Sequence, residues 1–270
     1  MNLAPRCSDN NEPLPGTAKR GDTFVLLEHP GPWSHDILDG HTFGADTERL
    51  SALPGLTLIR RPGREGHQRG HTRTVYLVFS AEGVAERLHI TSLDDLFTLD
   101  LTGPGRNDAE PVSTLMLVCT HAKRDQCCAI KGRPIAADLA ARGAHVWESS
   151  HTKGHRFAPA IVIFPHGYVY GRLNAEAALQ AYTFAERGEI FLPGLRGRGL
   201  YDAPGQAAEI AVLGELGQAR FGDLSVHGTE VRHRDGRVWH IDARQETMDV
   251  VASCGAASKP GKVWVAKIRP

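Results

Sequence analysis

Apolar residues in this chain occur in short runs bounded by Gly, Pro and polar positions. Before residue 100 the runs read TFVLLE, LTLIRR and TRTVYLVFS; between residues 111 and 173 they read TLMLVCTH, AHVWESS, AIVIFP and YVYGRL. Runs of this length, rich in β-branched and aromatic residues, are typical of buried strands. The chain is therefore predicted to be built on a sheet, with His166-Gly167 turning the last two runs into a hairpin.

Longer segments with helical spacing lie between these strands. They cover residues 45–53, 133–142 (RPIAADLAAR), 175–188 and 206–217. Asn174 is a predicted N-terminal cap, and Gly143 and Gly188 are predicted stops. After residue 193 the pattern changes to alternating positions, with Asp235-Gly236 as a hairpin turn. The last part is predicted to be antiparallel and rich in β-structure.

These elements divide the chain into four parts. Residues 1–20 are polar and rich in Pro and Gly, which predicts an extended arm. A Gly-Pro-Gly linker and a polar stretch separate an α/β domain at 21–108 from a second one at 109–192. The second has the order strand–helix–strand, hairpin, helix, which predicts an α/β fold with a thioredoxin-like, ferredoxin-type core. Residues 193–270 form the β-rich extension.

The first α/β domain resembles a degenerate copy of the second. HQRGHTRTVYLVFSAEG, from His67, and HTKGHRFAPAIVIFPHG, from His151, share an HxxGH run followed by an apolar strand and a glycine turn. Duplication of a thioredoxin-like unit is one explanation and chance similarity is the other. The first copy has no cysteine, so it lacks the donors for an equivalent metal centre.

Composition narrows the classes of function. Lys plus Arg and Asp plus Glu both number 31, so no basic surplus points to nucleic acid or to an anionic membrane. The start has no signal-peptide core and no later apolar run approaches a bilayer span, which predicts a cytoplasmic protein. An odd count of five cysteines argues against a disulfide framework and favours ligands or reactive thiols.

Two pairs of donors stand out in the second domain. Cys119 and Cys128 are separated by eight residues, and His151 and His155 by three, with Gly154 allowing close backbone approach. Thiolate and imidazole pairs suit a transition metal or an iron–sulfur centre. Structural zinc sites use cysteines two to four residues apart, so the wider gap favours a bulkier cluster, with zinc as the alternative.

The other candidate residues have simpler interpretations. Cys127 is adjacent to Cys128, and the sequence leaves open whether it replaces Cys128 as a ligand. Cys7 and Cys254 are expected to be structural or free thiols, and His121 and His145 are expected not to be ligands. Asp125 is predicted to cap the loop or to orient a ligand histidine. Lys123, Arg124 and Lys153 flank the ligands and either solvate the loops or steer an anionic redox partner.

The sequence resembles the sucrase/ferredoxin-like family of thioredoxin-fold [2Fe–2S] proteins. The resemblance rests on VCTHAKRDQCC and HTKGHRFAP, and extends to EPLPGTA, LLEHPGPW and YGRL. It implies a [2Fe–2S] cluster held by Cys119, Cys128, His151 and His155, with Cys127 outside the ligand set. It further implies an electron-transfer protein that docks with a redox partner protein.

The ligand set predicts the redox behaviour. Bis-His, bis-Cys Rieske clusters have potentials of roughly −150 to +300 mV, against about −400 mV for all-Cys plant-type clusters. Imidazoles that take up a proton on reduction predict a potential that falls as the pH rises. The alternatives are a zinc-stabilised binding or scaffold protein and a cluster-dependent oxidoreductase. Sugar hydrolysis is disfavoured, because Glu148 has no second carboxylate beside it in the sequence.

Overall fold

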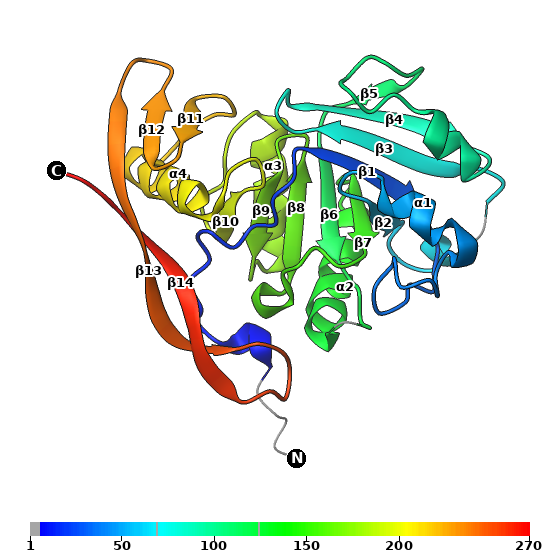
Figure 1. Cartoon of the computed structure of the whole chain (residues 1–270), viewed down its shortest axis with the longest axis horizontal. Coiled ribbons are helices and arrows are strands. Elements are labelled where there is room, and N and C mark those ends of the chain that lie inside the picture. The colour runs from blue at the N-terminus through cyan, green and yellow to red at the C-terminus, as the bar shows by residue number, and fades with distance from the viewer. Residues whose placement is uncertain (1–5, 69, 124) are drawn as a thin grey trace.

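Within residues 6–68, 70–123 and 125–270, which the computed structural model describes, two sheets form the scaffold. Ten of the described strands form one mixed sheet in the order β10-β9-β8-β6-β7-β2-β1-β3-β4-β5 (Figure 1). Four more form the antiparallel sheet β11-β12-β13-β14. The predicted α/β class and the β-rich C-terminal part are confirmed.

The large sheet repeats one arrangement in its two halves. Its strands are β1 (Thr23–Glu28), β2 (Thr57–Arg60), β3 (Arg73–Phe79), β4 (Val84–Ile90), β5 (Glu110–Val112), β6 (Leu115–Cys119), β7 (Val146–Ser149), β8 (Ala160–Phe164), β9 (Tyr168–Gly171) and β10 (Leu195–Arg198). β1 pairs parallel with β2 and antiparallel with β3, which pairs with β4; β6 pairs in the same way with β7 and β8, and β8 with β9. The halves join through the antiparallel pair β2–β7, so one sheet continues across the linker near residue 108.

Both faces of the large sheet are buried. Along β6, Leu115 and Leu117 pack with Leu26 and Tyr76 of the first half, in a core that both halves share. Met116 and Val118 point to the other face and pack under helices. Because successive side chains of a strand alternate between faces, these strands are apolar at every position. This explains why they read as continuous apolar runs.

Three long helices cover the face of β6–β10 on which Met116 and Val118 lie: α2 (Gln126–Ala141), α3 (Ala175–Glu186) and α4 (Ala203–Leu216). The Asn174 side chain caps α3 as predicted, accepting a bond from the Ala177 amide at 2.8 Å. The short α1 (Thr47–Ser51) lies in the first half. Short 3-10 turns are η1 (Cys7–Asp9), η2 (Gly44–Asp46), η3 (Glu65–His67), η4 (Asp94–Thr98) and η5 (His155–Phe157).

Helix α2 begins seven positions earlier than the predicted segment at 133–142. Asp125 is its N-cap, and Pro134 is accommodated inside the helix. Cys127 and Cys128 therefore lie in the first turn of a helix and not in a loop. The sequence pattern misses this turn because the two cysteines read as candidate ligands and not as helical positions.

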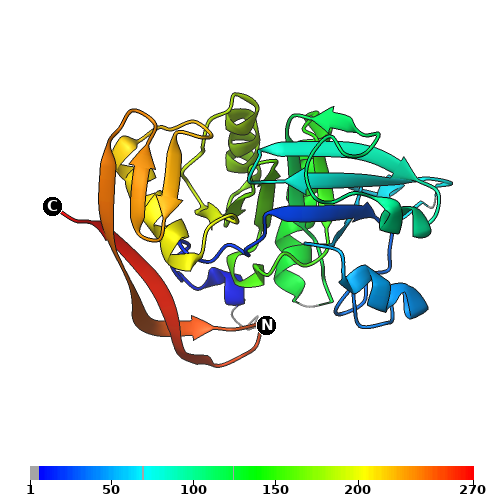
Figure 2. The ribbon, with the colours of Figure 1, turned by 45° about the horizontal axis from the view of Figure 1, so that its top comes forward.

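The N-terminal segment and the β13–β14 connection meet beside α2. The second sheet consists of β11 (Leu224–His227), β12 (Glu230–His233), β13 (Val238–Val251) and β14 (Ser258–Ile268). The long β13–β14 hairpin sweeps past the body of the molecule, and its connection lies beside η1 (Figures 1 and 2). Asn10 donates to the Asp249 carbonyl there. The N-terminal arm is therefore not free of the body: Cys7, Ser8 and Glu12 are buried.

None of the helices in the described part of the chain has the length and apolar character needed to cross a membrane.

Candidate metal centre

Cys119 and Cys128 lie at the meeting point of a strand and a helix. Cys119 ends β6 and Cys128 is in the first turn of α2, and both side chains are fully buried. Gly132 of α2 packs directly on this strand end, because a Cβ there would lie 2.3 Å from the Cys119 carbonyl oxygen. Any larger residue at position 132 would therefore push the start of α2 away from the end of β6.

The two buried thiols influence each other's pKa. A hydrogen bond from Cys128 lowers the pKa of Cys119 well below its usual range against the effect of burial, and His151 adds a further bond. The same Cys119–Cys128 bond, together with burial, raises the pKa of Cys128. Cys119 therefore interacts with Cys128 and with His151.

His151 and His155 lie beside each other, with ring centroids 5.6 Å apart. His155 starts η5 and donates from Nε2 to the Ala252 carbonyl at 2.8 Å, so the β13–β14 connection holds this ring. The Nδ1 atoms of both rings are buried and have no hydrogen-bond partner among the described residues. Buried polar atoms without partners are costly, and a metal is one group that would satisfy them.

Two neighbouring histidines, His121 and His145, have hydrogen-bond partners for both ring nitrogens. His121 bonds the Ser34 carbonyl through Nε2 at 2.7 Å and accepts the His151 amide at Nδ1. His145 bonds the Tyr76 hydroxyl and the Thr114 carbonyl through its two nitrogens. Both rings are fully engaged, in keeping with their expected non-ligand roles.

A second group of donors lies on the other side of Cys128. The ligand atoms of Cys7, Asp125, Cys127 and Cys254 all lie within 4.8 Å of one another. All five cysteines of the chain consequently pack in one cluster with Ala158 and Ala160. Sequence reasoning assigned Cys7 and Cys254 no role in a site. A single sequence carries no signal that positions 247 residues apart meet.

Asp125 joins this second group and not the histidines. Its carboxylate accepts the Cys127 amide at 2.9 Å, which is the predicted capping role, and the Cys254 amide at 3.0 Å. Burial raises its pKa, but these amide bonds and the thiols outweigh burial and lower the pKa to about 2. The predicted alternative, orientation of a ligand histidine, is performed instead by the Ala252 carbonyl.

A buried cation lies next to the four predicted ligands. Arg196 has no exposed surface; its Nε donates to the Thr17 hydroxyl, and its guanidinium lies 4.6 Å from the centre of the Phe157 ring. Burial and the nearby Arg156 together lower its pKa to about 9. Its Nη1 has no partner among the described residues, and a Cβ on Gly154 would lie 2.4 Å from it.

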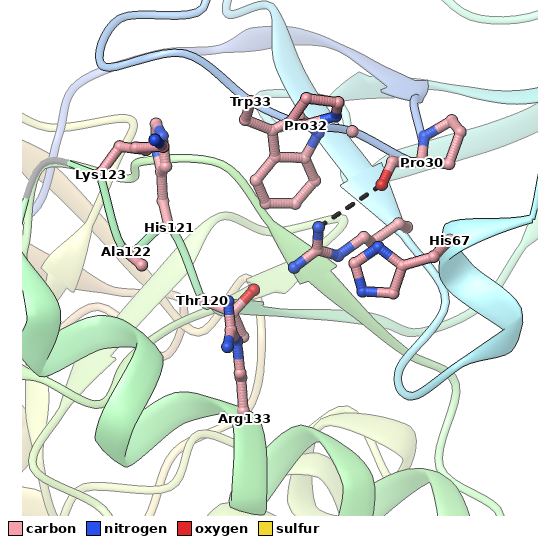
Figure 3. Close-up of a pocket in the computed structure, with 11 residues that line it drawn as sticks. Pro30, Pro32, Trp33, His67, Thr120, His121, Ala122, Lys123 and Arg133 are labelled. Atoms are coloured by element: carbon pink, nitrogen blue, oxygen red, sulfur yellow. Dashed lines mark hydrogen bonds between the residues drawn. The ribbon is translucent and has the colours of Figure 1, made fainter.

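Cavities with basic walls surround the ligand loops. A cavity of about 480 Å³ is lined by both predicted ligand histidines and by Lys153, Arg156 and Lys262. Another, of about 380 Å³, lies beyond Cys119 and is lined by the cations Arg60, Lys123 and Arg133 with His67, His121 and Trp33 (Figure 3). Arg124 lies outside the described residues.

The buried partner of Glu148 is the basic residue Arg60 and not a second carboxylate. Its Oε2 accepts from Arg60 Nε at 2.8 Å and Nη2 at 2.7 Å, and from the Thr120 hydroxyl at 3.0 Å. A carboxylate tied into an ion pair in this way is held as a structural anion, and not as one of two catalytic carboxylates.

Comparison with known proteins gives one match. The family model described as "Sucrase/ferredoxin-like" matches residues 14–197, more than half of the chain. No curated protein and no solved structure matches. The matched range includes the four predicted ligands and ends before the β13–β14 hairpin.

Proposed function

We propose, because the chain belongs to the sucrase/ferredoxin-like family, that Cys119, Cys128, His151 and His155 hold a [2Fe–2S] cluster and that the protein transfers electrons. The family and a Cys/Asp group able to bind metal fit a metal-binding protein. The proposal goes further on one observation. Two buried imidazole nitrogens without partners belong to rings beside a hydrogen-bonded pair of buried thiols.

The donor set suits such a cluster. Sulfur and imidazole ligands are those of bis-His [2Fe–2S] centres. The four donors are not part of the compact group within 4.8 Å that a single ion would need, which favours a centre with two irons over zinc. The strand order β9-β8-β6-β7, with β6 and β7 parallel, supports the thioredoxin-like assignment of this half.

The residues of the chain prepare the site in three ways. The Ala252 carbonyl accepts a hydrogen bond from Nε2–H of His155, which leaves Nδ1 of that ring free to bind a metal. The start of α2 places its dipole at Cys128, which favours the thiolate form of a ligand there. The Arg196 guanidinium offsets negative charge from a buried position. When bound, the cluster takes up and releases a single electron.

The surface around the histidines suits a partner with negative charge. Cys119 and Cys128 are buried, whereas His151 and His155 are half-buried and line the cavity with Lys153, Arg156 and Lys262. The histidine edge is therefore the short route to solvent and to a docked protein. The same cavity, at about 480 Å³, also has room for a small molecule, which keeps a cluster-dependent oxidoreductase as the second candidate.

The test is a spectrum of anaerobically purified full-length protein with iron and sulfide analysis. We expect visible absorption that bleaches with dithionite, and a paramagnetic resonance signal of the reduced form. Cys119→Ser, Cys128→Ser, His151→Ala and His155→Ala should lose iron, whereas the adjacent control Cys127→Ser should keep it. Colourless protein that contains zinc at these four residues would overturn the proposal.

A further inference from the structure

Three thiols and a carboxylate meet outside the four proposed cluster ligands. Cys7 Sγ lies 3.7 Å from Cys127 Sγ and 3.8 Å from Cys254 Sγ, and Cys127 and Cys254 are 3.0 Å apart. The Asp125 oxygens lie 3.6 Å from the Cys7 sulfur and 3.2 Å from the Cys254 sulfur. The donors come from η1, the cap and first turn of α2, and the β13–β14 connection.

We propose that Cys7, Asp125, Cys127 and Cys254 form a separate zinc site that fastens the N-terminal arm and the β13–β14 connection to the start of α2.

The spacing of the sulfurs matches a tetrahedral ion. Zinc binds thiolate at about 2.3 Å, so two thiolates at a tetrahedral zinc lie about 3.8 Å apart. Two of the three sulfur pairs lie at 3.7 and 3.8 Å, and the third pair, at 3.0 Å, has to open to about the same separation. A carboxylate oxygen completes a four-donor set of the kind that zinc takes.

The surroundings of the donors resemble a prepared ligand shell. The Ser8 hydroxyl donates to Cys127 Sγ at 3.4 Å. The Cys127 and Cys254 amides each donate to one Asp125 oxygen, which fixes the carboxylate and leaves a lone pair on each oxygen for a metal. Cys7, Asp125 and Cys127 are buried, while the half-buried Cys254 gives the ion a path of entry.

A disulfide between Cys127 and Cys254 is the competing explanation. It would use two of the three thiols, and a bond length of about 2.05 Å requires them to approach from 3.0 Å. It also leaves Cys7 with only a thiol hydrogen bond to Asp125. A divalent ion uses all four groups and offsets part of their negative charge, so the arrangement favours the metal.

The first measurement needs no variant. Full-length protein is purified under reducing, anaerobic conditions, and its zinc and iron are counted by elemental analysis. We expect one zinc per chain. Replacement of this zinc by Co²⁺ should give the thiolate charge-transfer and tetrahedral d–d bands. Wild-type protein without zinc, or a cobalt spectrum without thiolate bands, would overturn the proposal.

Variants then assign the ion to these residues. Cys7→Ser and Cys254→Ser should weaken zinc binding about tenfold or more. The neighbouring, exposed Ser253→Ala is the matched control and should leave it unchanged. Circular dichroism checks that each variant is folded. Zinc retained at full affinity in Cys7→Ser and Cys254→Ser would refute the site, as would peptide mapping of a Cys127–Cys254 disulfide in zinc-free protein.

The proposed iron–sulfur cluster and the proposed zinc site can be tested independently of each other. Cys128→Ser should lose iron and keep zinc, and Cys254→Ser should do the reverse. Zinc that disappears only with Cys119→Ser or Cys128→Ser would place the ion at the four-ligand site and refute both assignments. Protein that contains iron but no zinc would refute only the zinc site. Protein that contains zinc but no iron would refute only the cluster site.

Discussion

The two histidines of the proposed cluster site differ in their surroundings, and in particular in the hydrogen bonding of the ring nitrogen that would not bind iron. The Nε2 proton of His155 is bound to the Ala252 carbonyl. His151 is half-buried, lines the cavities of about 260 and 480 Å³, and is itself held through its backbone amide by His121. The proton-coupled behaviour predicted from the ligand types is expected to depend mainly on the His151 ring.

The midpoint potential of the loaded protein should fall as the pH rises through the neutral and alkaline range, by up to about 59 mV per unit for one proton and one electron. His151→Cys should lower the potential and flatten the slope, because the exchangeable imidazole is replaced by a thiolate. Protein-film voltammetry across pH measures both. A wild-type potential independent of pH would contradict proton coupling.

Arg196 is the second residue whose surroundings have a consequence for the potential. Its buried charge favours an added electron nearby, so Arg196→Gln should lower the midpoint potential, on the order of 60 mV for a tenfold change in the reduction equilibrium. Arg196→Lys keeps the charge and should recover part of the shift. Arg198→Gln removes another buried arginine, held by the Ser80 and His166 carbonyls, and serves as the control. An unchanged potential in Arg196→Gln would contradict the role of the charge.

At the scale of elements, the contact between α2 and β6 positions the thiols. The sequence predicted β6, β7, the β8–β9 hairpin and the cap of α3, because apolar runs and a capping Asn are local signals. It missed the first turns of α2, since Asp125 and the two cysteines look like loop and ligand residues. The four predicted ligands followed from local spacing and family resemblance. The sequence could not predict the residues around these ligands, because contacts between distant segments leave no local pattern. These residues are Ala252, Arg196, Cys7 and Cys254.

Gly132→Ala tests the contact between α2 and β6. Alanine is the better helix former, but its Cβ would meet the Cys119 carbonyl at 2.3 Å, where backbone has to move. We expect a loss of about 1–3 kcal/mol in the free energy of unfolding, typical of overpacking. Gly214→Ala in α4 is the matched control: its Cβ meets nothing within 4 Å, and it should gain up to about 1 kcal/mol. Urea denaturation gives both values; equal effects at the two sites would contradict the close approach.

At the scale of the whole molecule, acidic and basic residues are equal in number but are unevenly distributed. Lys plus Arg equals Asp plus Glu at 31 each, yet the walls of the cavities beside the ligand loops are predominantly basic. Buried ionisable groups also lie far from the ligands. Glu209 of α4 has no exposed surface, accepts the Tyr168 hydroxyl at 2.9 Å, and has a pKa that burial raises to about 7.

The basic walls predict salt-sensitive electron transfer. Lys153→Glu and Lys262→Glu should slow reduction by an anionic partner protein and reduce the dependence of the rate on ionic strength, because screening acts on the attraction that they remove. Lys267→Glu, an exposed charge near the other end of β14, is the control. Stopped-flow reduction at several salt concentrations provides the rates. Equal slowing by all three variants would contradict a localised docking surface.

Glu209 makes stability depend on pH. Its folded pKa of about 7 lies above its ordinary value of 4.5, so its contribution to stability is complete below pH 4.5 and is lost as the pH rises through 7. Glu209→Gln cannot ionise, so its stability relative to wild type should improve over this window by on the order of 3 kcal/mol. Urea denaturation of both proteins at a series of pH values measures the difference. A difference constant across pH would contradict a buried, titrating Glu209.

The meeting of Cys7 and Cys254 sets an order of events during synthesis. A ribosome releases Cys7 at the start of translation and Cys254 only after the large sheet and β11 to β13 have been made, because chains fold from the N-terminal side as they emerge. The Ala252 carbonyl that holds His155 arrives equally late. A nascent chain stopped before the β13–β14 connection contains all four proposed iron ligands but neither this carbonyl nor the third thiol. The proposed zinc site therefore cannot be complete until the β13–β14 connection has been synthesised.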